Sequence, residues 1–186
     1  HFGLHGRFGL PHDFPHRHDP VAAAKRIFDL YVAYGMTVNY ENQNWFARPE
    51  WTEPCAVVDS FMVAAQLFAA TGEEKYLPMV NRILYNGMLR TQRGNGGFGC
   101  DKCATDGVLA AHCYEAFWCC SMRGGEGLSA CARYAYMIKG DTIVVPYMTE
   151  SEADLIVDGK QVELPDNWMG LGDAWLISKM DETEEV

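Results

Sequence analysis

The chain has 186 residues, of which 48% are hydrophobic and 12% aromatic, so it can bury a core and is not a disordered chain. Its formal net charge of -10 argues against nucleic acid as a partner, because phosphate binding requires a basic surface. The sequence shows no secretory h-region and no apolar run of ~18 residues, so we expect no membrane span and no membrane partner.

The cysteine count constrains the redox environment. Seven cysteines are an odd number, so at least one has no disulfide partner within the chain. The simplest interpretation is a reducing compartment in which cysteines stay as thiols or bind metal, which predicts a cytoplasmic protein. The chain begins at His1 without a methionine, and we expect it to be a fragment or a processed product.

The first 20 residues have the composition of a loop, rich in His, Gly, Pro and Phe and without a hydrophobic period. They hold five of the six histidines of the chain. A histidine-rich loop can bind metal. We favour a solvated loop or the polar wall of a cleft over a metal site here.

Three helices are predicted in the first half of the chain. The first spans residues 20–34, because Asp19 can cap it, proline suits its first position and Gly35 suits its end. The second spans about 54–70 and is apolar nearly all round, which predicts burial on most faces. The third runs over about 73–90, with acidic residues at its start and an arginine at its end.

Two long connections separate these helices from the rest. Residues 36–52 form a polar and aromatic loop that contains Glu41 and Glu50. Loops of this length in compact domains are usually functional or disordered. Residues 93–107 are rich in glycine, but no Lys-Ser/Thr follows them and no predicted strand precedes them. We therefore predict a tight irregular turn rather than a phosphate loop.

The second half changes from helix to strand. A short helix is predicted over 108–117 and another over 127–137. Strands are predicted over 142–148 and 175–178, and Asp158-Gly159 predicts a hairpin between two further strands. Helices followed by strands are typical of α+β chains or of an all-α domain that leads into an all-β domain.

Two short motifs offer metal ligands. Cys119 and Cys120 are adjacent, and Glu53 and Cys55 flank a proline at the start of the second predicted helix. Three thiolates and one carboxylate suit a tetrahedral zinc ion. A helix N-terminus lowers the pKa of a thiol, so we expect a thiolate at the first motif. Adjacent cysteines can reach one metal only from a turn or kinked segment, which would leave one sulfur facing a cleft.

Other interpretations of these cysteines remain open. Any single cysteine can simply be a buried free thiol. Cys100 and Cys103 form a competing Cys-x-x-Cys half-site that could complete a Cys₄ zinc site with Cys119 and Cys120. The same pair could act alone in redox chemistry, but no thioredoxin-like pattern surrounds it.

The chain resembles the bacterial glycoside hydrolase family 127, the β-L-arabinofuranosidase family. The resemblance rests on residues 52–59, 82–87 and 118–120, which occur in the family's order. It implies a mainly α fold, with part of an (α/α)₆ barrel catalytic domain in residues 1–138. The start of a β-sandwich domain would follow in residues 139–186.

The resemblance also implies a site and a reaction. Glu53, Cys55, Cys119 and Cys120 would bind Zn²⁺, and Cys119 would be the nucleophile of a retaining glycosidase that acts on pentofuranosides similar to β-L-arabinofuranosides. The family's acid/base is a glutamate in the loop before the Glu-x-Cys motif. We predict Glu41 for this role, because Glu50 lies very close to the metal ligands.

Substrate contacts are predicted from the same resemblance. His5 matches a histidine of the family's sugar pocket, and four aromatic residues could form sugar-stacking walls, although core packing is the favoured role of each. They are Trp45, Phe46, Trp51 and Trp118. The expected partner is an oligosaccharide or a glycoconjugate.

The chain also departs from the family. A barrel of twelve helices at ~11–12 residues each needs more than 186 residues, so we expect part of a larger enzyme. Asn81 stands where the family often has an acidic residue, and four further cysteines lie outside the family pattern, so the substrate could differ. They are Cys100, Cys103, Cys113 and Cys131.

Two alternatives to a glycosidase remain open. One is a non-catalytic zinc-stabilised module, and the other is a carbohydrate-binding or interface piece completed by a homo-oligomer or a partner chain.

Overall fold

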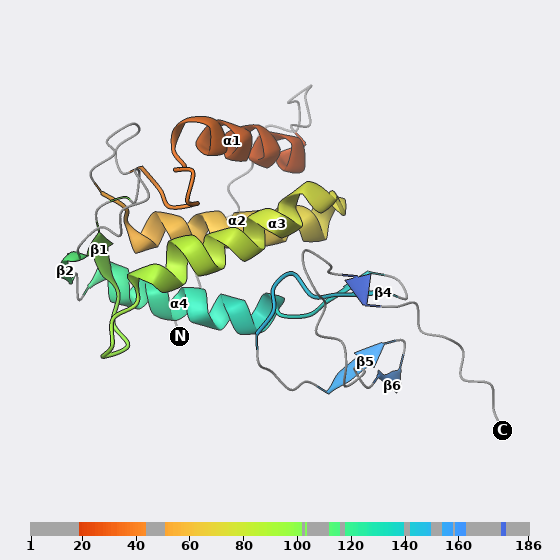
Figure 1. Ribbon diagram of the computed structural model, residues 1–186. Helices are drawn as coiled ribbons and strands as arrows, with labels where there is room; N and C mark the ends of the chain where they lie inside the picture. Colours follow the sequence, from red (N-terminus) through yellow and green to blue (C-terminus); the bar gives the residue numbers. More distant parts are fainter. Residues whose placement is uncertain are drawn as a thin grey trace, which may run out of the picture.

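The computed structural model describes residues 19–43, 51–101, 103, 112–115, 118–139, 142–149, 154–157, 159–162 and 176–177. This part of the chain is mostly helical, and its short strands come mainly after the helices (Figure 1). The α-helices are α1 (Pro20–Tyr34), α2 (Pro54–Thr71), α3 (Leu77–Arg82) and α4 (Cys119–Tyr134). The mainly α character is confirmed, but the predicted order of helices before strands holds only in part, because β1 (Gly99–Asp101) and β2 (His112–Glu115) precede α4. The barrel, the sandwich and the division at residue 138 stay predictions.

Helix α1 follows the predicted boundaries. The side chain of Asp19 accepts a hydrogen bond from the backbone N–H of Val21 at 2.9 Å, and Pro20 occupies the first turn. The N–H of Gly35 donates to the carbonyl oxygen of Tyr31 at 2.7 Å and closes the helix. Capping at both ends therefore fixes where the chain leaves α1 and enters the loop that carries Glu41.

Helix α2 is the centre of the described structure and contacts α1, α3 and α4 (Figure 1). It ends at Gly72, whose positive φ of 68° suits glycine. By length and composition alone α2 could cross a membrane, so the expectation that no segment is long and apolar enough was wrong. Half of the helix is nevertheless buried inside the protein, which is how a core helix packs.

The third predicted helix is helical throughout but changes type along its length. A 3₁₀ turn, η1 (Glu74–Tyr76), leads into α3, and a π-helix, η2 (Ile83–Met88), leads into a second 3₁₀ turn, η3 (Leu89–Thr91). A Cβ on Gly87 would lie 2.5 Å from the carbonyl oxygen of Tyr40, so glycine lets the loop after α1 pack directly on η2. Such π-segments are frequent at functional sites.

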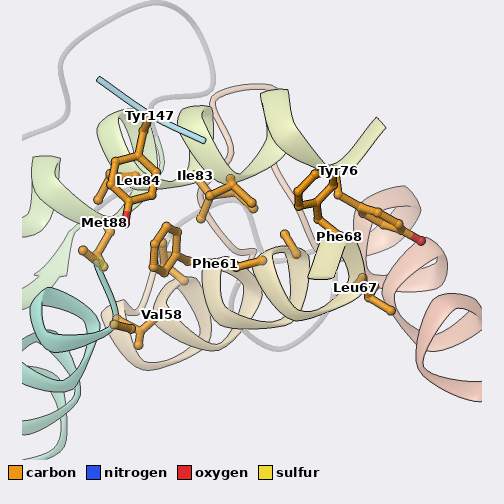
Figure 2. Packing of buried hydrophobic residues seen from close by; sticks show 14 of the residues in the cluster. Val58, Phe61, Leu67, Phe68, Tyr76, Ile83, Leu84, Met88 and Tyr147 are labelled. Carbon is orange, nitrogen blue, oxygen red and sulfur yellow. The ribbon is translucent and has the colours of Figure 1, made fainter. Parts of the chain in front are cut away.

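The core lies between α2 and the helical segment that follows it (Figure 2). Val58 and Phe61 of α2 are fully buried and face Met88 of η2. The rings of Phe61 and Tyr147 lie 5.9 Å apart, centroid to centroid. The hydroxyl of Tyr147 donates to the carbonyl oxygen of Cys131 in α4. The segment after the fourth strand is thereby tied to the helical core.

Two expectations for residues 93–137 were wrong. Strand β1 (Gly99–Asp101) pairs antiparallel with β2 (His112–Glu115), where a turn and a helix were predicted. The backbone of Asp101 also pairs with that of Thr52, so non-local pairing overrides the local pattern. Helix α4 begins at Cys119 rather than residue 127, because packing of its glycines compensates for their low helix propensity.

The remaining strands confirm the pattern predicted after residue 140. Strands β3 (Met137–Lys139), β4 (Thr142–Val144) and β7 (Leu176–Ile177) form an antiparallel sheet in the order β3-β4-β7. Strands β5 (Leu155–Val157) and β6 (Lys160–Val162) form the predicted hairpin, and Gly159 in its turn has a φ of 79°.

Candidate metal centre

The N-terminal ends of α2 and α4 bring together four side chains that could hold a metal ion. The ligand atoms of Glu53, Cys55, Cys119 and Cys120 all lie within 4.8 Å of one another. Glu53 caps α2, Cys55 lies in its first turn, and the two other cysteines open α4. The structure thus assembles the four residues that the sequence predicts as one zinc site.

Close packing of α4 on α2 makes this meeting possible. A Cβ on Gly127 would lie 2.7 Å from Cγ2 of Val58 and 2.6 Å from Sδ of Met88. A Cβ on Gly124 would lie 2.1 Å from the ring of Phe98. Real Cβ atoms do not approach other atoms so closely, so a side chain at Gly127 would push α4 away from α2 and η2, and one at Gly124 would push it away from Phe98, the residue before β1.

A buried hydrogen-bond network holds the backbone at Glu53. The side-chain oxygen Oδ1 of Asn42 accepts from the N–H of Glu53 at 2.6 Å and from the hydroxyl of Thr52 at 3.1 Å. Glu53 itself is extended, with φ -124° and ψ 121°, as the following Pro54 requires. Its carboxylate makes no capping hydrogen bond to α2, so the backbone is fixed while the carboxylate is turned to the cysteines.

An ion pair anchors this network to β1. The N–H of Thr52 donates to the carbonyl oxygen of Asp101 at 2.8 Å. The carboxylate of Asp101 is fully buried and accepts from the guanidinium of Arg93 at 2.9 Å. The loop before α2 and the strand before α4 are therefore held together next to the cluster.

The adjacent cysteines lie in the first turn of a regular helix, so the expectation of a turn or kinked segment was wrong. Helical side chains lean toward the N-terminus, which lets neighbours reach the same helix end. The two sulfurs are 3.8 Å apart. Cys120 is fully buried, Cys55 and Glu53 are half-buried, and Cys119 is exposed.

Burial controls the acidity of the cluster. Burial, reinforced by the neighbouring Cys119 thiol, raises the pKa of Cys55 to about 12. Burial also raises the pKa of Cys120. The expected lowering of the pKa at the start of α2 was therefore wrong, because desolvation outweighs the helix N-terminus. A bound cation would replace the thiol protons, and three sulfurs with one carboxylate form a donor set that fits zinc.

Glu41, the predicted acid/base, is not one of the four clustered residues. The Glu41 side chain is fully buried and forms an ion pair with Arg90 of η3. The backbone N–H of Glu41 donates to Oγ1 of Thr37 at 3.1 Å, which fixes the turn. Trp118, next to Cys119, is 85% exposed. His5, Trp45 and Glu50 lie outside the described residues.

Sequence reasoning missed several residues that build the site. Nothing in the local sequence marked Asn42 as an anchor for Glu53 or Arg90 as a partner of Glu41. Cys100 was considered as a ligand, and its sulfur lies 3.6 Å from that of Cys120. Cys103 instead donates to the carbonyl oxygen of Asn42 at 3.4 Å. The structure therefore favours the Glu/Cys₃ cluster over the competing Cys₄ site.

The fold and site define a mainly helical domain with a thiol-rich candidate metal centre between two helix N-termini. A family model described as "Beta-L-arabinofuranosidase, GH127 catalytic domain" matches residues 30–133, which is more than half of the chain. The chain belongs to this family, and the predicted resemblance is confirmed. No curated protein matches the chain.

Proposed function

We propose that this chain is the catalytic segment of a retaining glycoside hydrolase that acts on pentofuranosides similar to β-L-arabinofuranosides. The family supports glycosidase chemistry in general. The observation that supports the finer proposal is the exposure of Cys119 within a cluster whose three other donors are buried or half-buried. A closed structural site has no use for an exposed ligand, whereas a nucleophile must reach its substrate.

Zinc is the proposed cofactor. Glu53, Cys55, Cys119 and Cys120 would hold it. When bound, it supplies the positive charge that keeps these thiols ionised near neutral pH and fixes the direction of the nucleophile. The raised pKa of Cys55 is consistent with this need for a cation.

The proposed reaction has two displacements at the anomeric carbon. In the first, the thiolate of Cys119 forms a carbon–sulfur bond while the glycosidic carbon–oxygen bond breaks. A glutamate donates its proton to the leaving oxygen. In the second, the same glutamate takes a proton from water, the water oxygen attacks the carbon, and the thiolate of Cys119 leaves.

We propose Glu41 as this glutamate, with Glu50 as the second candidate. Glu41 precedes Asn42, the residue that anchors Glu53, so one turn carries both the acid/base candidate and the support of a metal ligand. The ion pair of Glu41 with Arg90 must open before the carboxylate can reach a glycosidic oxygen. Glu41→Gln and Glu50→Gln, compared in the same assay, decide between them.

The exposed ring of Trp118 is proposed as a sugar-stacking surface beside the nucleophile, because an indole face packs well on a sugar ring. Contacts from His5 and Trp45 stay predictions. An oligosaccharide or glycoconjugate is the proposed substrate class, and a cytoplasmic, reducing location is proposed because the cluster requires free thiols.

Metal content and turnover, measured together, test the proposal. Cys119→Ala should abolish turnover of an aryl β-L-arabinofuranoside, whereas Cys131→Ala, in the same helix but outside the cluster, should retain it. Wild type should bind one zinc ion per chain, and Cys120→Ala should weaken that binding. Full turnover by Cys119→Ala would contradict the nucleophile assignment. Stoichiometric zinc without turnover of any tested pentofuranoside would favour a non-catalytic zinc-stabilised module.

A further inference from the structure

We propose that Cys100 and Cys120 form a reversible disulfide that protects Cys119 from irreversible oxidation by hydroperoxides. This inference concerns the regulation of the proposed metal centre and rests on that proposal. The sulfurs of Cys100 and Cys120 lie 3.6 Å apart, and those of Cys119 and Cys120 lie 3.8 Å apart. The Cys120 sulfur is therefore in contact with the sulfurs of both the exposed Cys119 and the buried Cys100.

The fold fixes the position of Cys100. The hydroxyl oxygen of Ser121 accepts from the N–H of Phe98 at 3.1 Å, and the hydroxyl lies 3.3 Å from the Phe98 carbonyl oxygen. The ring of Phe98 fills the space left by Gly124. These contacts join Phe98, the residue before β1, to the first turns of α4. The approach of Cys100 to Cys120 is thus set by the same packing that builds the cluster.

Cys100 lies next to the cluster but is not one of its four members among the described residues. Cys120 consequently has two alternative partners: the metal ion, with Glu53 and the two other cysteines, or the sulfur of Cys100. A disulfide would remove one of the four metal ligands. Bound zinc should in turn protect Cys120 from oxidation, because a metal-bound thiolate is not free to form the disulfide.

The chemistry balances with hydrogen peroxide as the oxidant. Peroxide oxidises the exposed Cys119 thiol to a sulfenic acid and releases one water. The Cys120 thiol attacks that sulfur, forms a disulfide and releases a second water. The Cys100 thiol then attacks the Cys120 sulfur, which leaves a Cys100–Cys120 disulfide and restores the Cys119 thiol. Two thiols have lost two electrons and two protons, and one peroxide has become two waters.

The final thiol–disulfide exchange favours the Cys100–Cys120 disulfide over the Cys119–Cys120 disulfide. A disulfide between adjacent residues closes a small ring whose geometry departs from the preferred one, and strained disulfides are easily attacked. Cys100 reaches Cys120 from another element and closes a larger, less constrained loop. Without Cys100, the strained Cys119–Cys120 disulfide has no resolving thiol and reverts with water to the Cys120 thiol and the Cys119 sulfenic acid, which further peroxide oxidises to the irreversible sulfinic acid.

Peptide mass spectrometry tests this inference independently of turnover. The full chain, stripped of zinc with a chelator, is treated with hydrogen peroxide, alkylated and digested. Wild type should show a Cys100–Cys120 linkage that dithiothreitol reverses, and preloading with zinc should suppress it. Cys100→Ser should lack the linkage and accumulate two added oxygens on Cys119. Cys103→Ser, a control at a buried cysteine that contacts Asn42 instead, should behave like wild type.

Three outcomes would overturn the inference. They are a disulfide that joins other cysteines, the absence of any disulfide in wild type, and equal sulfinic acid at Cys119 in wild type and Cys100→Ser. Cys100→Ala serves as a second variant, and circular dichroism under reducing conditions establishes that both variants fold. A linkage without any glycosidase activity would support this inference while contradicting the nucleophile proposal. Glycosidase activity without the disulfide would contradict this inference and leave the nucleophile proposal supported.

Discussion

The side-chain oxygen of Asn42 lies 2.6 Å from the backbone nitrogen of Glu53 and accepts its hydrogen bond. This contact joins the turn after α1 to Glu53, the first residue along the chain of the four in the candidate metal centre. The N–H of Glu53 is at a helix N-terminus and has no partner within α2, so Asn42 satisfies a group that would otherwise be unpaired. Asn42 therefore supports a candidate metal ligand, Glu53, and is not itself one of the four clustered residues.

Asn42→Ala should weaken zinc binding by about 10-fold to 100-fold, because loss of a supporting hydrogen bond lets the ligand backbone move. Competition with a chromophoric chelator measures this affinity. Asn86→Ala, at an exposed position on η2, is the matched control and should bind zinc like wild type. Equal zinc affinity in both variants would show that the Asn42 contact does not position Glu53.

Breaking the ion pair between Arg93 and Asp101 should be costly. Asp101 is fully buried, and removal of one partner of a buried pair leaves an uncompensated charge. Arg93→Ala should therefore lower the free energy of unfolding by about 3–5 kcal/mol, measured by urea denaturation. Asp59→Ala, which removes the exposed partner of Arg123, should cost less than about 1 kcal/mol. Similar losses in the two variants would contradict this difference.

Substituting alanine for two glycines of α4, Gly127 and Gly125, should change the stability of the protein in opposite directions. Gly127→Ala places a methyl group 2.6 Å from Met88 and should destabilise the fold by about 1–3 kcal/mol while weakening zinc binding. Gly125→Ala meets open space and should stabilise α4 by about 0.5–1 kcal/mol through higher helix propensity. Thermal unfolding of both variants measures the contrast. A neutral Gly127→Ala would mean that α4 does not need its close approach to α2.

Alkaline pH should destabilise the protein through Tyr31. Burial raises the pKa of Tyr31 from 10.0 to about 12. Above pH 10 the unfolded chain loses the phenol proton while the folded chain keeps it, so the stability contributed by this group is complete below pH 10 and falls as pH rises toward 12. Tyr31→Phe should flatten this fall in urea denaturation across that range. Parallel pH curves for the two proteins would contradict the assignment.

Local signals predicted the elements whose boundaries are set within a few residues. Asp19 and Gly35 delimit α1, and Gly159 marks the hairpin of β5 and β6. The meeting of the four clustered side chains was also predicted, because the Glu-x-Cys and Cys-Cys motifs resemble the family's motifs. Site residues that lie in short sequence motifs can therefore be predicted before the fold is known.

Features that depend on tertiary packing were not predicted. The β1–β2 pair is supported by backbone pairing of Asp101 with Thr52, which lies 49 residues earlier in the chain, beyond the reach of any local signal. The early start of α4 depends on Gly124 and Gly127, whose low helix propensity is offset by close contacts with other elements. The approach of Cys100 to Cys120 follows from the same contacts.

Trapping the glycosyl-enzyme tests the central claim most directly. The zinc-loaded protein is mixed with an activated aryl β-L-arabinofuranoside, quenched in acid and digested, and its peptides are examined by mass spectrometry. We predict one pentosyl group on the sulfur of Cys119, and none in Cys119→Ala. Turnover with the pentosyl group on another residue, or with no covalent sugar at any time point, would contradict Cys119 as the nucleophile.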